Sequence, residues 1–214
     1  MAGEMFGGLR EGRLLMTDPP VAPPLAAAVE VVANEPKQQA VLMAGFRGAD
    51  ALSPDRVALE LIDTASSDMA SRFFHRIREE LGLAYFVGAS QMMGFAPGIF
   101  TFYLGTDPAK VDLVRKNFDE EIAALASDGL TEAELVRAKK KLIGSEAIRN
   151  QSLEAFAHVV AVDELYGLGA EHYAQRMAEI NAVTLEQVRA VARRYFHEPS
   201  RATVLVTPAS AAMA

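Results

Sequence analysis

Two polar side chains, Arg78 and Tyr85, have the types and spacing that best suit chemistry on a bound molecule. Arg78 falls in the last turn of a predicted helix, Gly82 is a natural C-terminal stop, and Tyr85 falls early in the strand that follows. A guanidinium and a phenol at one corner could both donate hydrogen bonds to a peptide carbonyl beside the sheet. A charge-assisted bond of this kind contributes roughly 1.5–3 kcal/mol, and more on a developing oxyanion. The residues alone favour a simpler interpretation, in which Arg78 compensates the helix C-terminus and Tyr85 half-buries its ring.

The sequence has no histidines and glutamates at the spacing of a known catalytic zinc motif. The four histidines are His75, His158, His172 and His197. Neither His-x-x-Glu-His nor His-Glu-x-x-His occurs, so no histidine pair shares a helix turn with a carboxylate base. Glu154 and Glu79 each stand one turn from a histidine, but catalytic zinc usually takes three protein ligands. We interpret the histidines as surface or capping residues, and we predict no metal ligand and no catalytic residue in this chain.

Composition excludes several other classes of function. The chain has no cysteine, which removes disulfides and thiolate catalysis, and it shows no Gly-rich phosphate loop or Gly-x-Ser-x-Gly elbow. Its net charge of −7 gives it little reason to hold a nucleic acid backbone. No apolar run approaches the span of a bilayer, and Met1 to Arg13 lack an apolar signal core. We therefore expect a soluble chain with no membrane insertion and no signal peptide. The sequence does not indicate its cellular compartment.

The helices and strands that position Arg78 and Tyr85 are predicted from hydrophobic patterns and from the turn-forming residues between them. Residues 1–27 are a Pro-rich, linker-like segment, residues 28–208 form one domain, and residues 209–214 form a tail. Strands are predicted at Ala28–Ala33, Gln38–Phe46, Leu83–Phe95, Ile99–Gly105 and Arg201–Val206. Pro97-Gly98 is a turn, so the two strands beside it are antiparallel.

Helices fill the rest of the predicted domain. One starts at Ser53-Pro54-Asp55, and a second has Phe73, Phe74, Ile77 and Leu81 on its buried side. Further helices are predicted from Asp107, from Thr131 to about Arg149, at Ser152–Leu165, near Glu171–Ile180, and from Thr184 to Phe196. Thr131 with Glu134, and Thr184 with Gln187, make capping boxes. Strands gathered early and helices late predict an α+β fold, with one mainly antiparallel sheet and helices packed on one face.

One segment resembles a known signature. It contains Ser71, Arg72, Phe74, Arg78, Gly82, Leu83 and Tyr85. At the same spacing, these residues resemble the second, metal-free domain of the pitrilysin/insulinase zinc peptidase family. Further segments resemble the family's sequence at corresponding places: Gln38-Gln39, Ser53-Pro54-Asp55, Gly105–Pro108, Leu130–Leu135 and Val183-Thr184. The resemblance spans about Pro19 to Pro208, nearly the whole chain.

The resemblance implies a function that the residues alone do not. In that family two homologous α+β halves close on a peptide, and the catalytic half carries His-x-x-Glu-His, zinc and the glutamate base. The other half supplies an arginine and a tyrosine that bind substrate, which by resemblance are Arg78 and Tyr85. The chain is then the substrate-binding, metal-free half of a zinc metalloendopeptidase, inactive alone, with zinc in its partner and peptide as substrate. Residues 65–68 depart from the family's frequent glycine-rich run, which leaves any backbone contact of that loop open.

Two alternatives remain. The same fold serves non-proteolytic structural or assembly subunits, such as the core subunits of mitochondrial respiratory complexes. A free-standing zinc enzyme is a third possibility, which the ligand count opposes.

Overall fold

Five strands form a single mixed sheet in the computed structural model, which describes residues 2–8 and 21–209. The sheet order is β1-β5-β2-β4-β3. The strands are β1 (Val29–Glu35), β2 (Ala40–Arg47), β3 (Ala84–Met92), β4 (Ile99–Thr106) and β5 (Arg201–Pro208). β1 pairs with β5 in parallel, and the other three pairings are antiparallel. The predicted mainly antiparallel sheet, including the antiparallel strands on either side of Pro97, is confirmed.

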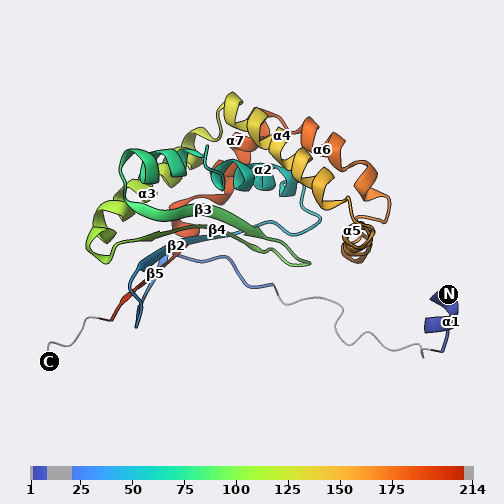
Figure 1. The fold of residues 1–214 in the computed structure, drawn as a ribbon, viewed down its shortest axis with the longest axis horizontal. Helices are drawn as coiled ribbons and strands as arrows, with labels where there is room; N and C mark the ends of the chain where they lie inside the picture. Colours follow the sequence, from blue (N-terminus) through green and yellow to red (C-terminus); the bar gives the residue numbers. More distant parts are fainter. Residues whose placement is uncertain (1, 9–20, 210–214) are drawn as a thin grey trace.

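The helices cover one face of this sheet (Figure 1). They are α2 (Arg56–Ser66), α3 (Val111–Asp128), α4 (Glu132–Arg149), α6 (Arg176–Ala182) and α7 (Leu185–Tyr195), with α5 (Leu153–Tyr166) at one end of the layer. Short 3₁₀ turns lie at Pro108–Lys110, His172–Ala174 and Glu198–Ser200. This arrangement confirms the α+β prediction. Within residues 2–8 and 21–209, no helix is both long and apolar enough to cross a bilayer.

Residues 1–27, predicted to be a linker, lie partly outside the described chain. Within them, α1 (Ala2–Phe6) is a single short helix, and residues 21–25 run without regular structure. The Arg47 guanidinium donates to the Ala22 carbonyl at 2.7 Å, which ties this segment to the end of β2. Of the predicted tail, residues 210–214 are outside the described range, whereas Ala209 donates from its N–H to the Glu35 carbonyl at 3.0 Å.

Capping residues set the start of the helices in the second half of the chain. The Thr131 hydroxyl accepts from the Glu134 N–H at 3.2 Å, and the Glu134 carboxylate accepts from the Thr131 N–H at 2.7 Å. Thr184 and Gln187 repeat this reciprocal pattern at the start of α7. Both predicted capping boxes are confirmed. The start predicted at Ser53 is displaced: α2 begins at Arg56, because the Ser53 hydroxyl accepts from Asp55 N–H and closes a turn first.

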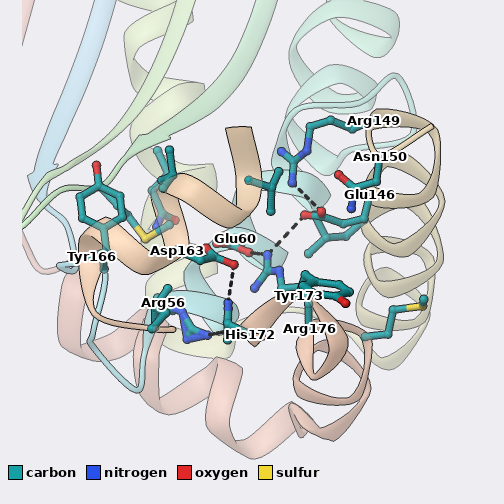
Figure 2. Close-up of a pocket in the computed structure, with 18 of the residues that line it drawn as sticks. Arg56, Glu60, Glu146, Arg149, Asn150, Asp163, Tyr166, His172, Tyr173 and Arg176 are labelled. Carbon is teal, nitrogen blue, oxygen red and sulfur yellow. Dashed lines mark hydrogen bonds and ion pairs between the residues drawn. The ribbon is translucent and has the colours of Figure 1, made fainter. Parts of the chain in front are cut away.

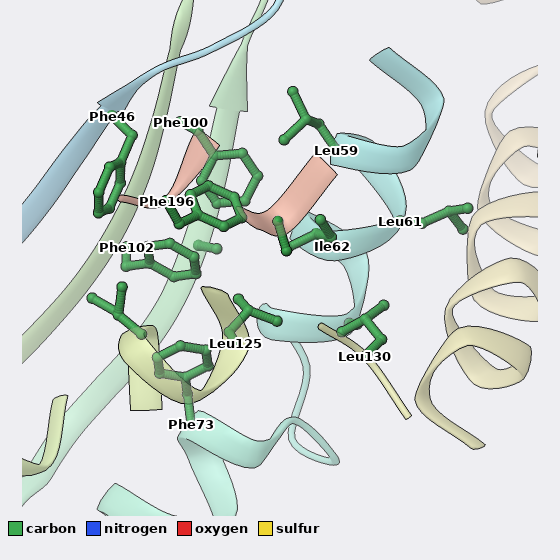
Figure 3. Packing of buried hydrophobic residues seen from close by; sticks show 14 of the residues in the cluster. Phe46, Leu59, Leu61, Ile62, Phe73, Phe100, Phe102, Leu125, Leu130 and Phe196 are labelled. Carbon is green, nitrogen blue, oxygen red and sulfur yellow. The ribbon is translucent and has the colours of Figure 1, made fainter. Parts of the chain in front are cut away.

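An aromatic cluster joins the sheet to its helices (Figure 3). Phe102 on β4 is fully buried, and its ring centroid lies 5.2 Å from Phe73, 5.0 Å from Phe100 and 5.2 Å from Phe196. Phe46 of β2 makes an edge contact with the same ring at 6.2 Å. Because these rings come from strands and from segments beside helices, the cluster couples the two layers of the fold.

The opposite face of the sheet is apolar and carries no helix in the described part of the chain. Register places Val31, Val204, Met43 and Tyr103 in one row across β1, β5, β2 and β4. Val31 is 51% exposed and Met43 is 37% exposed, whereas the neighbouring row through Leu42 and Leu104 is buried under the helices. The fold therefore leaves a row of apolar side chains in water on one side of its sheet.

Replacing Phe102 tests the coupling of the two layers. Phe102→Ala is expected to lower the free energy of unfolding by about 3–5 kcal/mol, because it removes buried ring surface and leaves a cavity. Urea denaturation followed by circular dichroism measures this change. Leu153→Ala is the control, since Leu153 is 84% exposed and its loss should change stability by no more than about 0.5 kcal/mol. Equal effects of the two changes would contradict the role given to the cluster.

Candidate functional site

The predicted helix-to-strand corner is present, but its helix is of the π type. Residues Phe74–Glu80 form a π-helix with Arg78 in its last turn. Leu81 N–H donates to the Arg76 carbonyl at 3.3 Å, and Leu83 N–H donates to the Ile77 carbonyl at 2.9 Å. Gly82 turns the chain with a φ of +58°, a backbone conformation that favours glycine. The chain therefore passes from helix to strand over three residues, Leu81, Gly82 and Leu83.

The wider turn changes which side chains of this helix are buried. Phe73 and Ile77 are fully buried, as the sequence predicts, but Leu81 is 37% exposed and Phe74 is only partly buried. The expectation that Leu81 lies on the buried side is wrong. A π-helix has more residues per turn than an α-helix, so the spacing of three to four residues fails after Ile77.

Arg78 is exposed and free of strong partners. Its guanidinium carbon lies 4.9 Å from the centroid of the Phe74 ring, in a cation–π contact. Among the described residues no carboxylate pairs with it, and no backbone carbonyl accepts from it. The turn after the helix is met instead by Lys110, whose Nζ donates to the Gly82 carbonyl at 3.3 Å. Compensation of the helix C-terminus by Arg78, the simpler interpretation from sequence, receives no support from these contacts.

Tyr85 stands at an irregularity in the edge strand β3. Ala84 pairs with Thr106 and Phe86 pairs with Gly105, so Tyr85 is the extra residue of a β-bulge. Its side chain is 52% exposed, in agreement with a half-buried ring. No hydrogen bond or ion pair joins Tyr85 to Arg78 in the described structure. Both side chains are exposed and flank the corner. That both donate hydrogen bonds to the same peptide carbonyl stays a prediction.

Two other residues of the signature hold the corner in place. The buried Ser71 hydroxyl accepts from the Phe74 N–H at 3.1 Å and caps the helix start. Arg72 donates from Nε and Nη2 to the two oxygens of Glu134, at 2.9 Å and 2.5 Å, and from Nη2 to the Gly129 carbonyl at 3.0 Å. The signature thus combines anchoring residues at its start with exposed polar residues at its end.

The ion pair of Arg72 and Glu134 should make stability depend on pH. Burial opposes the charge of Glu134, but bonds from Arg72 and Thr131 outweigh it and lower the pKa of Glu134 below its ordinary 4.5. Stabilisation by this carboxylate is therefore complete above pH 4.5 and is lost as pH falls through the lowered pKa. Glu134→Gln, which keeps a capping amide, should lower the free energy of unfolding by about 1.5–3 kcal/mol at pH 7.

At a pH below the lowered pKa of Glu134, the variant and the parent chain should approach equal stability, because both side chains are then uncharged. Urea denaturation at the two pH values measures the difference. Glu132→Gln, a change at an exposed position in the same helical turn, is the matched control. A gap between Glu134→Gln and the parent that is the same at both pH values would show that charge is not the cause.

A cavity of about 610 Å³ lies on the helix side of the sheet, between α2, α4, α5 and the end of β3. Sequence reasoning missed it, since its walls come from segments far apart in the chain. Part of its lining is a network of paired charges (Figure 2). Arg56 lies 2.7 Å from His172 Nε2 and 2.5 Å from Glu179, and His172 Nδ1 lies 2.9 Å from Asp163.

His172 departs from its predicted role. It is 8% exposed, so its assignment as a surface or capping histidine is wrong. Gly167 and Gly169, both with positive φ, turn the chain after α5 and carry His172 back against α2. The other histidines named from sequence, His75, His158 and His197, are exposed.

The described residues offer no set of three or more histidine, cysteine, aspartate or glutamate side chains arranged to hold a metal. Around His172 the position that a cation would take is already filled by the Arg56 guanidinium, which contacts both His172 and Glu179. A zinc ion has no matching donor set in this part of the chain.

Comparisons with known proteins give a consistent pattern. A family profile described as "Peptidase M16 inactive domain" matches residues 1–142. An uncharacterized zinc protease of Streptomyces coelicolor is 34% identical over 170 residues, covering 78% of this chain and 37% of that protein. One from Bacillus subtilis is 30% identical over 173 residues, covering 80% of this chain and 42% of that protein. The chain thus spans about two fifths of the length of these relatives.

Solved structures with lower identity show the same fold. The peptidase M16 inactive domain from Pseudomonas fluorescens superposes with a TM-score of 0.83 at 23% identity, covering 92% of this chain and 47% of that one. A protease from Helicobacter pylori gives a TM-score of 0.86 at 18% identity, covering 96% of this chain and 50% of that one. In both cases the solved chain is about twice the length of the part that matches.

Proposed function

The chain belongs to the peptidase M16 inactive-domain family, the metal-free half of the pitrilysin/insulinase type, and from that premise we propose that it binds peptide for a zinc metalloendopeptidase. A catalytic half bearing His-x-x-Glu-His would complete the peptide-binding chamber. The observation that carries the proposal is the corner of the family signature, where Arg78 and Tyr85 are exposed beside an edge strand.

The uncovered face of the sheet supports an assembly with a second domain. Its exposed apolar row through Val31 and Met43 is the kind of surface that usually binds another chain or domain. The curated relatives are more than twice as long as the matched region, which leaves room in them for a further domain. The missing metal donors in the described residues are also explained if the catalytic groups belong to the other half.

The proposed role of this chain is to hold and polarise the peptide. Zinc in the partner half would activate the attacking water and polarise the scissile carbonyl. Arg78 would donate hydrogen bonds from its guanidinium to a carbonyl oxygen of the peptide, and Tyr85 would donate from its phenol. Neither donor is hydrogen-bonded or ion-paired with another polar group of the described structure. Both can therefore bind a ligand with no ion pair to break first. Bonds that strengthen as the carbonyl becomes an oxyanion would speed cleavage.

Variants of the two donors test the proposal in a mixture with a catalytic half of the family. Arg78→Ala and Tyr85→Phe should each reduce kcat/KM for peptide cleavage by about 10-fold or more, which is the loss of roughly 1.4 kcal/mol or more of transition-state binding. A fluorogenic peptide assay at fixed zinc concentration measures the rates.

Arg76→Ala is the matched control, since Arg76 lies on the same helix but pairs with Glu80 at 3.2 Å. Association of the two halves is measured separately, so a lost partner is not mistaken for a lost donor. Cleavage at the parent rate in both Arg78→Ala and Tyr85→Phe would overturn the assigned role. A non-proteolytic assembly subunit on the same fold would then be the better account.

A further inference from the structure

Helix α5 is apolar on all sides, yet none of its residues is fully buried. Its side chains are aliphatic or aromatic except at Glu154, His158, Asp163 and Glu164. Leu153 is 84% exposed and Leu165 is 65% exposed. A helix that is apolar on all sides usually lies inside a core, where its neighbours cover it completely. The described fold therefore leaves α5 with less packing than its sequence suits.

Hollows lie on two sides of α5, which Figure 1 shows at one end of the helical layer. Phe156, Val159 and Val162 line the cavity of about 610 Å³. Val159 and Val162 also line a second hollow of about 630 Å³, together with Arg149. Side chains beside such hollows lack partner atoms on that side and so gain little dispersion energy. Packing therefore contributes little to holding α5 against the domain.

The caps of α5 are made by residues at its own ends. The Ser152 hydroxyl accepts from a main-chain N–H of the first turn at 3.1 Å, and the Leu168 N–H donates to the Asp163 carbonyl at 2.9 Å. Gly167 and Gly169 turn the chain at this end, with φ of +83° and +91°. Glycine has the widest range of backbone conformations, and hinges form at the ends of such elements. The helix can therefore turn about these glycines while its caps stay in place.

A hydrogen bond between Asp163 and His172 spans these glycines. Asp163 Oδ2 lies 2.9 Å from His172 Nδ1. His172 is fixed on the other side, because its Nε2 lies 2.7 Å from the Arg56 guanidinium of α2 and 3.1 Å from Glu179 of α6. The bond therefore joins α5 to a buried residue that the body of the domain holds in place, and we call this bond the latch.

Three further polar or ring contacts hold the side chains of α5 in the described structure. Glu164 accepts from a main-chain N–H just beyond the glycines at 2.8 Å, and the ring centroids of Phe156 and Tyr173 lie 4.8 Å apart. The rings of Tyr166 and Phe95 are also 4.8 Å apart. The partner residues in these three contacts are exposed. Among the described residues, the latch is thus the one polar contact that ties a side chain of α5 to a buried side chain.

We propose that α5 is a hinged lid over the cavity. It opens about Gly167 and Gly169 when the latch breaks, while the sheet and the other helices stay folded. Opening exposes the apolar wall of the cavity, including Leu142 of α4 and Phe156 of α5. A 14-residue helix away from its domain is only marginally stable in water, so its main-chain amides then exchange with solvent. Local opening of this kind needs far less free energy than unfolding of the whole domain.

Hydrogen exchange followed by mass spectrometry tests the proposal on the full 214-residue chain. Amides of α5 should exchange about 100-fold or more faster than those of Leu135–Leu142 in α4. In about 1 M urea, exchange in α4 should accelerate and exchange in α5 should change much less, because opening of one helix exposes less new surface than unfolding. This difference separates opening of the lid from unfolding of the domain.

Asp163→Ala removes the latch. Alanine favours helix, and the change takes away an acid near the negative end of the helix dipole, so it does not weaken the helix itself. Exchange in α5 should become about 10-fold faster, while exchange in Leu135–Leu142 stays within about 2-fold of the parent chain. His158→Ala, at an exposed position of the same helix, is the matched control and should accelerate neither.

Three results would overturn the proposal. One is exchange in α5 as slow as in α4, because the helix would then open only when the whole domain unfolds. Another is equal acceleration of α4 and α5 in Asp163→Ala, which would make the bond a support of the whole domain and not a latch. The last is fast exchange in α5 that Asp163→Ala leaves unchanged, which would show fraying that is independent of His172. None of these measurements requires peptide cleavage, so the outcome is independent of the proposed peptidase role.

Discussion

The bidentate ion pair between Arg72 and Glu134 is the interaction on which the candidate peptide site depends. One carboxylate receives the guanidinium of Arg72 and the N–H of Thr131, and the same guanidinium reaches the Gly129 carbonyl. The end of α3, the start of α4 and the entry to the π-helix therefore meet at one partly buried point. A corner that carries two exposed donors gains its fixed position from this point, because neither donor is held by partners of its own.

Packing carries that fixed position into the sheet. Phe73 follows Arg72 directly in the chain, and its ring stacks on Phe102 of β4 at 5.2 Å. The strand that follows the corner, β3, pairs with β4 from Ala84 to Met92, apart from the bulge at Tyr85. Consecutive residues of one short segment thus make the ionic anchor and the aromatic anchor. Loss of either should disturb the corner without touching the exposed donors themselves.

Sequence patterns predicted those features that depend on neighbouring residues. The capping boxes at Thr131 and Thr184 each depend on side chains three positions apart, and both are present. The π-helix escaped prediction because hydrophobic spacing assumes an α-helical period. The parallel pairing of β1 with β5, the paired charges around His172 and the cavity beside Gln91 join segments far apart in the chain. No local pattern records such contacts, so only the fold reveals them.

The π-helical turn also bears on how the signature can change over generations. A π-helical segment differs from an α-helix by the room for one additional residue, and single-residue insertion is a simple route to it. Because a π-helical turn takes up one more residue than an α-helical turn, deletion of one residue between Phe74 and Ile77 would let the turn relax toward α-helical geometry. Phe73, Ile77 and Arg78 would then face nearly the same directions about the helix axis as before. The length of this turn can thus change by one residue while the core contacts and the exposed guanidinium keep their places.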